Sequence, residues 1–348
     1  MTIKVLVVDD SALIRSLLST IIRSEKDMEL IGPAPDAYAA RDLVNCYAPD
    51  VITLDIEMPK VDGLTFLEKL MKAHPTPVIM ISTLTEQGTG ATMRALELGA
   101  IDYIAKPKLD VAHGIEGYRQ LILEKIRTAA EAKVKPIKNP IHNNTLVSDY
   151  SGTEKIIAVG ASTGGTEAIK AFLMQLPANS PAVVITQHMP PGFTTSFAKR
   201  LDELCIINVY EAQDGERILP GNAYLAPGNY HLSIERSGAD YRTRLLDTAR
   251  VSGHIPSVDV MFTSLAKCAA QNTLAVIMTG MGRDGAEGMY LLHQNGAFTL
   301  AQDEATSIVF GMPKEAITLG GVSEIVPLPQ LASKIIQQLQ TLKAGSRL

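Results

Sequence analysis

Residues 156–166 read Ile-Ile-Ala-Val-Gly-Ala-Ser-Thr-Gly-Gly-Thr, an apolar run that stops at a serine flanked by glycines. The β-branched residues of 156–159 are typical of a buried strand, and the apolar spacing of residues 167–174 favours a helix. Ser162 is therefore predicted to lie on a strand-to-helix turn, where small neighbours let the backbone turn sharply and expose the hydroxyl.

Three roles fit this turn. Gly160, Ser162 and Gly164 match the G-x-S-x-G pattern of serine nucleophiles. A glycine-rich turn before a helix also binds phosphate through backbone N–H groups, and many such turns are only turns. The stretch alone leaves all three roles open, so the rest of the chain has to decide between them.

Length and composition indicate two domains in a soluble protein. The chain has 348 residues, 46% of them hydrophobic, and a formal net charge of −5. Single cores stop growing near roughly 250–300 residues, so two cores are expected. No run approaches the roughly 18 apolar residues of a membrane span, and the N-terminal apolar run ends in acids without a cleavage site. We therefore expect a cytoplasmic protein without membrane insertion.

The three cysteines are expected to be reduced residues of the core. Cys46, Cys205 and Cys268 are odd in number, widely spaced and set in apolar surroundings. This pattern disfavours both disulfides and a metal site.

The N-terminal part of the chain alternates short apolar runs with helical patterns. The first runs and helices are expected at residues 4–8, 12–23, 28–32, 37–46 and 51–54. This alternation is typical of a doubly wound parallel sheet. In such sheets ligands gather beyond the carboxyl ends of the strands, so the residues that end each strand indicate the function.

Charged and polar side chains end these strands, namely Asp9, Asp10, Asp55, Ser82 and Lys106. Three carboxylates at one edge repel one another unless a cation lies among them, and an oxygen-only ligand set suits Mg²⁺. With the metal bound, Asp55 can accept a phosphoryl group as an acyl phosphate, while Lys106 and the Ser82 hydroxyl hold its oxygens. Helix capping is the alternative, but it explains Ser11 and not a strand-end lysine before a proline.

This half resembles the receiver domain of two-component response regulators. The resemblance rests on Val-Val-Asp-Asp-Ser, Leu-Asp-Ile-Glu-Met-Pro, Met-Ile-Ser-Thr and Gly-Ala-Ile-Asp-Tyr-Ile-Ala-Lys-Pro. It implies a flavodoxin-like fold in which Asp55 is phosphorylated and Asp9 and Asp10 help to hold Mg²⁺. It further implies that Ser82 is the switch hydroxyl and Tyr103 the switch aromatic residue.

A linker is predicted over residues 128–153. Periodicity is lost there, and prolines, lysines and asparagines are frequent. Its first residues can continue the last helix of the first domain. The sequence therefore predicts domains at residues 1–127 and 154–348.

The second domain does not have the charge pattern of a nucleic-acid-binding domain. From residue 151 onward it contains 15 Lys and Arg against 17 Asp and Glu, without a basic stripe. Strand-like runs at residues 156–159, 182–186, 223–226 and 274–278 again alternate with helical patterns. We therefore expect a second, mostly parallel α/β domain that binds no nucleic acid.

Three of these strands lead to the groups of a hydrolytic triad. Ser162, His188 and Asp284 follow the first, second and fourth runs and would meet at one sheet edge. His188 would act as general base and Asp284 would orient it. Their order along the chain differs from that of the α/β-hydrolases, so that fold is not implied. Backbone N–H groups of residues 279–285, or of the turn after Ser162, can form the oxyanion hole, and spacing does not choose between them.

Other histidines and aspartates compete for these roles. His231 and His254 can line a substrate cleft, but His188 directly ends a strand. Asp259 and Asp303 compete with Asp284, although Asp259 can instead cap a helix over residues 260–269.

The second domain resembles the catalytic domain of chemotaxis protein-glutamate methylesterases. The shared segments are Ala-Ser-Thr-Gly-Gly, Gln-His-Met-Pro-Pro-Gly-Phe-Thr-Thr-Ser-Phe-Ala, Tyr-Leu-Ala-Pro-Gly, Pro-Ser-Val-Asp-Val and Thr-Gly-Met-Gly-Arg-Asp-Gly-Ala. The resemblance implies a triad of Ser162, His188 and Asp284, with the backbone N–H of Met281 in the oxyanion hole and Thr163 assisting. Ile255 departs from the pattern, since the family often has an arginine there.

Together the two resemblances imply an esterase controlled by phosphorylation. Its expected substrates are methylated glutamates, and certain glutamines, of chemoreceptors, and its expected phosphodonor is the chemotaxis histidine kinase. Mg²⁺ is expected in the receiver domain, and no cofactor is expected in the esterase site. The unphosphorylated receiver would cover the cleft, and phosphorylated Asp55 would favour an open arrangement. The alternative is a receiver joined to a module that binds a nucleotide or phosphate without turnover.

Overall fold

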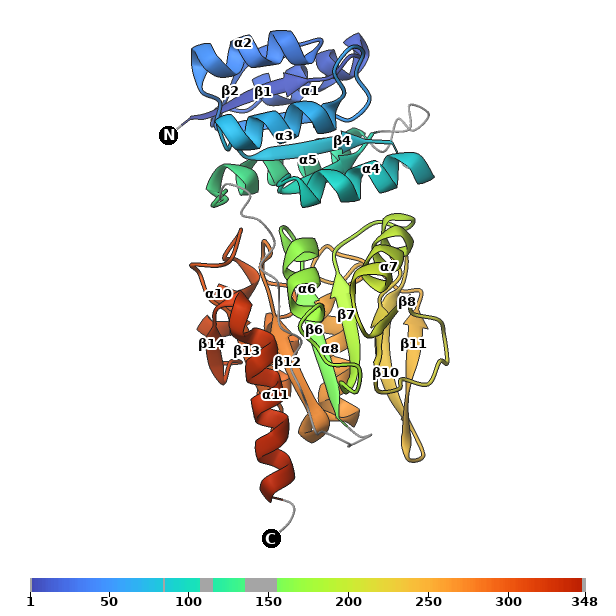
Figure 1. Ribbon diagram of the computed structural model, residues 1–348. Coiled ribbons are helices and arrows are strands. Elements are labelled where there is room, and N and C mark those ends of the chain that lie inside the picture. Colours follow the sequence, from blue (N-terminus) through green and yellow to red (C-terminus); the bar gives the residue numbers. More distant parts are fainter. Residues whose placement is uncertain (1, 84, 107–114, 135–154, 346–348) are drawn as a thin grey trace. The chain divides into compact units, whose positions relative to one another are not determined.

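The computed structural model describes residues 2–83, 85–106, 115–134 and 155–345. The chain forms two compact units, Met1–Pro140 and Ile141–Leu348, here named the N-terminal unit and the C-terminal unit. Both are α/β folds built on a parallel sheet (Figure 1). The predicted fold class is confirmed.

The N-terminal unit has a five-stranded sheet in the order β2-β1-β3-β4-β5. All of its strand pairs are parallel, as in a flavodoxin-like fold. The strands are β1 (Ile3–Val8), β2 (Met28–Ala34), β3 (Val51–Asp55), β4 (Val78–Ser82) and β5 (Asp102–Ala105). The helices are α1 (Ala12–Arg23), α2 (Ala37–Tyr47), α3 (Gly63–Ala73), α4 (Glu86–Glu97) and α5 (Ile115–Glu131).

Local signals explain where these elements begin and end. The side chains of Ser11, Asp36 and Asp62 cap α1, α2 and α3 by accepting hydrogen bonds from backbone N–H groups of the first turn. Strands β3 and β4 are buried at every position, as expected for central strands of a parallel sheet covered on both faces. Helix α5 continues to Glu131, into the predicted linker, and residues 135–153 of that linker lie outside the described part of the chain.

The C-terminal unit has a seven-stranded parallel sheet in the order β14-β13-β12-β6-β7-β9-β8. Its strands are β6 (Ile156–Ala161), β7 (Ala182–Gln187), β8 (Asn208–Glu211), β9 (Asn222–Leu225), β12 (Thr273–Ile277), β13 (Phe298–Gln302) and β14 (Glu324–Val326). The α-helices are α6 (Gly165–Leu173), α7 (Phe193–Leu204), α8 (Val258–Cys268), α9 (Ala286–Gln294), α10 (Met312–Thr318) and α11 (Leu328–Gly345), and η1 (Ala270–Asn272) is a short 3₁₀ helix.

The core of this unit lies on both faces of the sheet. Ile156 and Ala158 of β6 belong to a buried cluster with residues of α8, α9 and α10. The side chains between them, Ile157 and Val159, point to the opposite face because strand residues alternate. On that face α6 packs against β6 and α11 (Figure 1).

An antiparallel hairpin extends the face covered by α8. It joins β10 (His231–Ser237) to β11 (Asp240–Leu246), and the sequence analysis did not identify it. Leu232, Ile234 and Tyr241 place it in the same buried cluster as α8. The first residue of β10, His231, is fully buried.

The cysteine prediction is only partly right. All three cysteines are free, but Cys46 is exposed on the outer side of α2, and Cys205 and Cys268 are half-buried. Cys46 follows the buried Val44 by two residues, which turns it away from the sheet on a helix. Among the described residues, no helix combines the length and the apolar character needed to cross a bilayer.

Candidate functional site

Ser162, His188 and Asp284 come from three adjacent strands of the C-terminal unit. Ser162 follows β6, His188 follows β7, and Asp284 lies in the loop after β12, the other neighbour of β6. The helix after each of these residues is preceded by a glycine with positive φ, namely Gly164 (+75°), Gly192 (+85°) and Gly285 (+91°). These residues allow sharp turns in a conformation that side chains with a Cβ rarely adopt. The three candidate groups therefore meet at one edge of the sheet.

A chain of hydrogen bonds joins the three side chains. His188 Nδ1 lies 3.1 Å from Ser162 Oγ, and His188 Nε2 lies 2.7 Å from Asp284 Oδ2. The side chains of His188 and Asp284 are 8% and 1% exposed, so water barely reaches the second bond.

The buried carboxylate decides which ring nitrogen carries the proton. Asp284 is an acceptor when ionised, so Nε2 of His188 carries the hydrogen in this pair. Nδ1 is then left with a lone pair directed at Ser162 Oγ. The arrangement can take a proton from the serine hydroxyl, as a nucleophilic reaction requires. The general base would be Nδ1, which the sequence could not specify.

The N-terminus of α8 surrounds Asp284 with further donors. Ser257 Oγ donates to Oδ1 at 2.7 Å, and the backbone N–H of Val258 donates to Oδ2 at 2.7 Å. The N–H of Asp259 lies 3.2 Å from Oδ1. The first N–H groups of a helix lack partners within the helix and favour negative charge. Asp284 satisfies them from another segment and is held ionised.

The two neighbouring carboxyl groups are shifted in opposite directions. Burial alone would raise the pKa of Asp284, but the hydrogen bond from His188 and the donors of α8 lower it. Burial, and then the charge of Asp284, raise the pKa of Asp259. Asp259 lies inside α8, whose N-cap residue is Ser257, so Asp259 does not cap this helix, which was the alternative to a catalytic role. Its Oδ1 instead accepts the N–H of Gly288 at 2.8 Å.

Gly160 brings β6 close to α8. A Cβ at Gly160 would lie 2.3 Å from Val258 Cγ1 and 3.2 Å from Phe262 Cζ. Its φ is not positive, so this glycine serves close packing and not the turn that the sequence pattern suggested. The glycine therefore allows α8 to reach Asp284.

We expect Gly160→Ala to destabilise the C-terminal unit by about 1–3 kcal/mol, because the added methyl group overlaps Val258. Urea unfolding of the full chain measures the change. Gly90→Ala is the matched control, since a Cβ there meets nothing within 4 Å. A Gly160→Ala chain as stable as the Gly90→Ala chain would contradict this packing role.

The loop expected to supply the oxyanion hole passes beside Ser162 at Gly280. A Cβ on Gly280 would come within 2.9 Å of Ser162 Cβ, so the backbone just before Met281 is in contact with the serine. The backbone carbonyl of Thr279 accepts a hydrogen bond from the N–H of Ser162 at 3.0 Å. The Oγ1 hydroxyl of Thr279 donates to the carbonyl of Thr163, also at 3.0 Å. The loop with Met281 is thus tied to the turn with Thr163.

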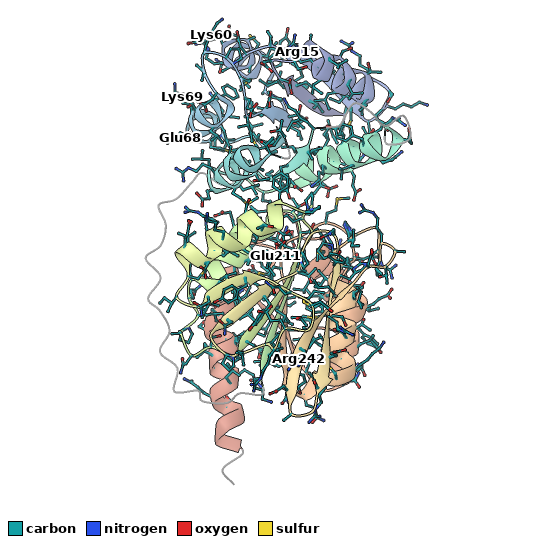
Figure 2. The ribbon with its side chains drawn as sticks, turned by 90° about the vertical axis from the view of Figure 1, so that its right-hand side faces the viewer. Arg15, Lys60, Glu68, Lys69, Glu211 and Arg242 are labelled. Carbon is teal, nitrogen blue, oxygen red and sulfur yellow. The ribbon has the colours of Figure 1, made fainter. Side chains whose placement is uncertain are left out.

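The loop after His188 is anchored by Glu211. Thr194 and Thr195, in the first turn of α7, donate to its two carboxylate oxygens at 2.6 and 2.7 Å. Glu211 ends β8 and is marked in Figure 2. This pair of bonds fixes the start of α7, and with it the segment that leads away from His188.

The competing residues have other partners. His231 lies between the carbonyl of Ala249 (3.0 Å) and the N–H of Ser257 (3.1 Å). Asp303 accepts the N–H and the hydroxyl of Thr306. His254 stacks on the ring of His188, an arrangement that the sequence analysis missed.

The acidic residues of the N-terminal unit gather at its sheet edge. One carboxylate oxygen each of Asp9, Asp10 and Asp55 lies within 4.8 Å of the others. Lys106 Nζ lies 2.7 Å from Asp55 Oδ2 and 3.4 Å from Asp9 Oδ2. Arg15, marked in Figure 2, donates to the backbone carbonyls of Asp9 and Asp10 and so fixes this turn.

This cluster fits a divalent cation. Asp9 is fully buried, and its Oδ2 has an ion pair with Lys106 at 3.4 Å but accepts no well-formed hydrogen bond among the described residues. Burial raises the pKa of Asp9. Burial also raises the pKa of Asp55 to about 6, although the hydrogen bond from Lys106 acts to lower it. The Lys106 ammonium contacts two of the three carboxylates, those of Asp9 and Asp55, and every ligand atom that the cluster offers is an oxygen, as Mg²⁺ prefers.

Lys106 is bonded to Asp55, whereas the two predicted switch residues, Ser82 and Tyr103, are buried against other partners. Ser82 is buried, and its Oγ lies 3.2 Å from the carbonyl of Gly88 and 3.3 Å from that of Thr83. The Ser82 hydroxyl is thus bonded to backbone carbonyls, one of which belongs to α4. Tyr103 is buried with Lys125 Nζ 5.9 Å from its ring centroid.

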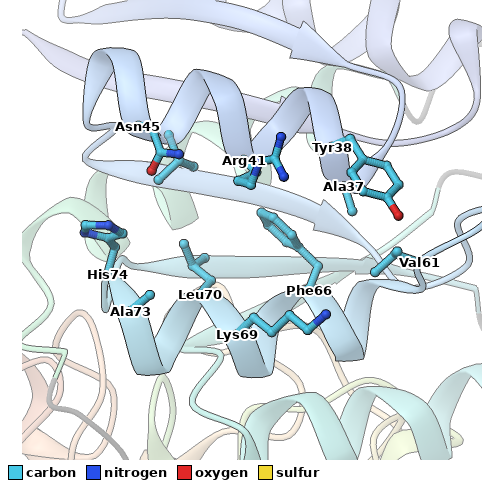
Figure 3. A pocket seen from close by; sticks show the side chains of 11 residues that line it. Ala37, Tyr38, Arg41, Asn45, Val61, Phe66, Lys69, Leu70, Ala73 and His74 are labelled. Atoms are coloured by element: carbon cyan, nitrogen blue, oxygen red, sulfur yellow. The ribbon is translucent and has the colours of Figure 1, made fainter.

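A separate pocket of about 410 Å³ lies between α2 and α3. Figure 3 shows Phe66 and Leu70 of α3 facing α2, with His74 at one end and Tyr38 at the other. None of the predicted site residues lines it.

Comparisons with known proteins agree with this architecture. The chain matches the family model "CheB methylesterase" over residues 157–335 and the model "Response regulator receiver domain" over residues 5–113. The C-terminal unit is similar to the crystal structure of the Thermotoga maritima CheB methylesterase catalytic domain. That match has a TM-score of 0.52 and 37% identity, and it covers 54% of this chain and 100% of that chain.

Full-length relatives are similar over both units. A Pseudomonas aeruginosa protein-glutamate methylesterase/protein-glutamine glutaminase 2 is 57% identical, with 100% of both chains covered. A Nitrosomonas europaea protein-glutamate methylesterase/protein-glutamine glutaminase is 56% identical over 97% of this chain and 96% of that protein. The chain therefore belongs to the CheB family of protein-glutamate methylesterases/protein-glutamine glutaminases, with a response-regulator receiver domain.

Proposed function

We propose that the C-terminal unit hydrolyses methyl esters of glutamate side chains, and amides of certain glutamine side chains, on chemoreceptors. The observation that carries the proposal is the bonded series Ser162–His188–Asp284, with distances of 3.1 and 2.7 Å. The activity named for the full-length relatives supports the choice of substrate.

The first half of the reaction would form an acyl-enzyme. Ser162 Oγ attacks the ester carbonyl carbon, and its proton passes to Nδ1 of His188. Asp284 stabilises the resulting imidazolium through Nε2. The tetrahedral intermediate then collapses, the bond to the methoxy oxygen breaks, and the imidazolium gives its proton to the leaving group. Methanol is released from an ester and ammonia from a glutamine amide.

The second half would use the same groups on water. Nδ1 of His188 takes a proton from water, whose oxygen attacks the acyl carbon. Collapse breaks the bond to Ser162 Oγ, which recovers its proton and leaves a glutamate side chain. The negative oxygen that forms in both halves needs preorganised donors. We assign this role to the backbone N–H of Met281, with Thr163 assisting, because both lie on the loops that flank Ser162.

We propose that the N-terminal unit controls this activity through phosphorylation of Asp55. Asp9, Asp10 and Asp55 would hold Mg²⁺, which supplies charge neutralisation for the phosphoryl oxygens. The Asp55 carboxylate attacks phosphorus, and the bond from phosphorus to a histidine nitrogen of the kinase breaks. Lys106 lies within 2.7 Å of the accepting carboxylate and can stabilise the added charge. Ser82 would turn from its carbonyl partners to the acyl phosphate, and Tyr103 would respond to that movement. Receptor substrates and kinase are cytoplasmic in this family, so we propose that compartment for the chain.

Replacing Asp55 by asparagine should abolish acyl-phosphate formation, because the amide is a poor nucleophile and a weaker Mg²⁺ ligand. Incubation with radiolabelled acetyl phosphate and Mg²⁺, followed by counting of protein-bound label, measures the effect. Asp62→Asn is the matched control, since Asp62 caps α3 through an oxygen that asparagine retains. Equal labelling of the Asp55→Asn and Asp62→Asn chains would refute the assignment.

Methanol release from methylated receptor tests the proposed function as a whole. The full chain should release methanol, and acetyl phosphate should raise the rate. The Asp55→Asn chain should keep the lower rate whether or not the phosphodonor is present. Absence of methanol release by the unsubstituted chain under both conditions would overturn the proposal.

A further inference from the structure

A second imidazole lies flat against the proposed general base. The ring centroids of His188 and His254 are 3.7 Å apart, and the ring planes differ by 12°. His254 is half-buried, and it precedes the segment that contacts Asp284. The contact therefore covers one face of the ring that must transfer the proton.

A tight turn presents His254 to this site. The N–H of His254 donates to the carbonyl of Val251 at 2.9 Å, and the N–H of Val251 donates to that of His254 at 3.1 Å. Between them Ser252 and Gly253 have φ values of +52° and +83°. Two positive φ values define the narrow turn of a two-residue hairpin. His254 is thus carried by a short, internally bonded loop.

Buried groups fix both ends of this loop. Ser257 N–H donates to Nδ1 of His231, so Nε2 of that ring carries the hydrogen and donates to the carbonyl of Ala249. His231 is fully buried and bridges the two ends of the segment 249–257. Ser257 Oγ also donates to Asp284. The loop with His254 is therefore bonded, through Ser257, to the same Asp284 carboxylate that holds His188.

We propose that His254 is a positioning residue that fixes the plane of the His188 ring during the proposed hydrolysis. The two hydrogen bonds of His188 are made by its two ring nitrogens. They hold the two nitrogens but only weakly oppose a tilt of the ring about the line between them, which small changes in the side-chain torsions of His188 permit. A flat partner whose ring centroid lies 3.7 Å away opposes that tilt.

His188 needs the support of the His254 ring most after Ser162 has been acylated. Ser162 Oγ then carries the acyl group and no longer donates to Nδ1, so His188 keeps only its bond to Asp284. The stacked ring holds Nδ1 toward the position of the attacking water. A misaligned catalytic group costs rate even when it remains present.

Replacing His254 tests this role, which rests on the proposed esterase activity. His254→Ala should lower kcat for methanol release about tenfold, the value of one aromatic pair, with little change in KM. His254→Phe keeps a flat ring without nitrogen atoms. Its decrease in log kcat should therefore be at most about half of that caused by His254→Ala. His293→Ala is the control, because this half-buried histidine contacts Thr299 and Ser323 instead.

The outcomes separate the two proposals. A His254→Ala chain with the kcat of the unsubstituted chain, or a His254→Phe chain as slow as His254→Ala, would overturn the stacking role. The former result would show that the ring plane needs no support, and the latter that a ring nitrogen is required. Absence of methanol release by the unsubstituted chain would overturn the proposed function itself. Thermal unfolding of both variants identifies a loss of rate that comes from misfolding, and His254→Phe remains informative if His254→Ala unfolds.

Discussion

Replacing Ser162 by alanine should lower the rate of methanol release by a factor on the order of 10⁴–10⁶. The expected loss is this large because the substitution removes the only atom that forms the acyl bond. Nδ1 of His188, 3.1 Å from Ser162 Oγ, would then face a methyl group. Binding and the oxyanion donors can leave a small residual rate by water attack. Methanol release from methylated receptor, with acetyl phosphate present, gives the measurement.

The control should share the chemistry of the change without touching the site. Ser333→Ala fits, because Ser333 is exposed on α11 and donates to the carbonyl of Gln330. Its rate should equal that of the unsubstituted chain. The Ser162→Ala chain should also still accept phosphate at Asp55, since the acid cluster lies in the other unit. A Ser162→Ala chain that releases methanol at the normal rate would exclude Ser162 as nucleophile.

The meeting of Ser162, His188 and Asp284 was predictable because one rule of parallel sheets places strand ends together. Strands β6, β7 and β12 are apolar at nearly every position, so their existence was evident from the sequence. Asp9, Asp55 and Lys106 followed from the same rule in the N-terminal unit. This is why two sites could be located before any geometry was known.

The contacts that do not involve strand ends were not predictable. The donors to Asp284 come from the start of α8, some 25 residues earlier in the chain, and only the packed structure brings them together. The same packing makes Gly160 necessary and puts His254 on His188. The hairpin of β10 and β11 mixes charged and apolar residues in alternation, and that period of two was the available signal.

Replacing Asp284 by asparagine should lower kcat about 10²–10⁴-fold while Ser162 remains in place. Asp284 now accepts from Nε2 of His188, from Ser257 Oγ, and from the N–H groups of Val258 and Asp259. An amide has one oxygen for these donors, and its NH₂ group would repel at least one of them. If that NH₂ faces His188, the ring adopts the other tautomer and Nδ1 carries a hydrogen. It could then no longer accept the proton of Ser162.

The same substitution should change the dependence of stability on pH. The folded-state pKa of Asp284 lies below its usual value of 3.8, so its charge stabilises the fold above that pH. This contribution is lost as the pH falls through the lowered pKa. The Asp284→Asn chain lacks it, so the difference in unfolding free energy between the two chains should shrink as the pH falls below about 4. Urea unfolding at a series of pH values measures that difference.

Asp303→Asn separates the role of Asp284 from a general effect of losing a carboxylate beside the sheet. Asp303 accepts the N–H of Thr306 through Oδ1, and asparagine can keep that bond. The Asp303→Asn chain should therefore retain its kcat. If it loses as much activity as Asp284→Asn, or if Asp284→Asn turns over normally, the orienting carboxylate has been wrongly assigned. We expect Asp303→Asn to keep its activity, because Asp284 accepts from His188 whereas Asp303 has no hydrogen bond with a histidine among the described residues.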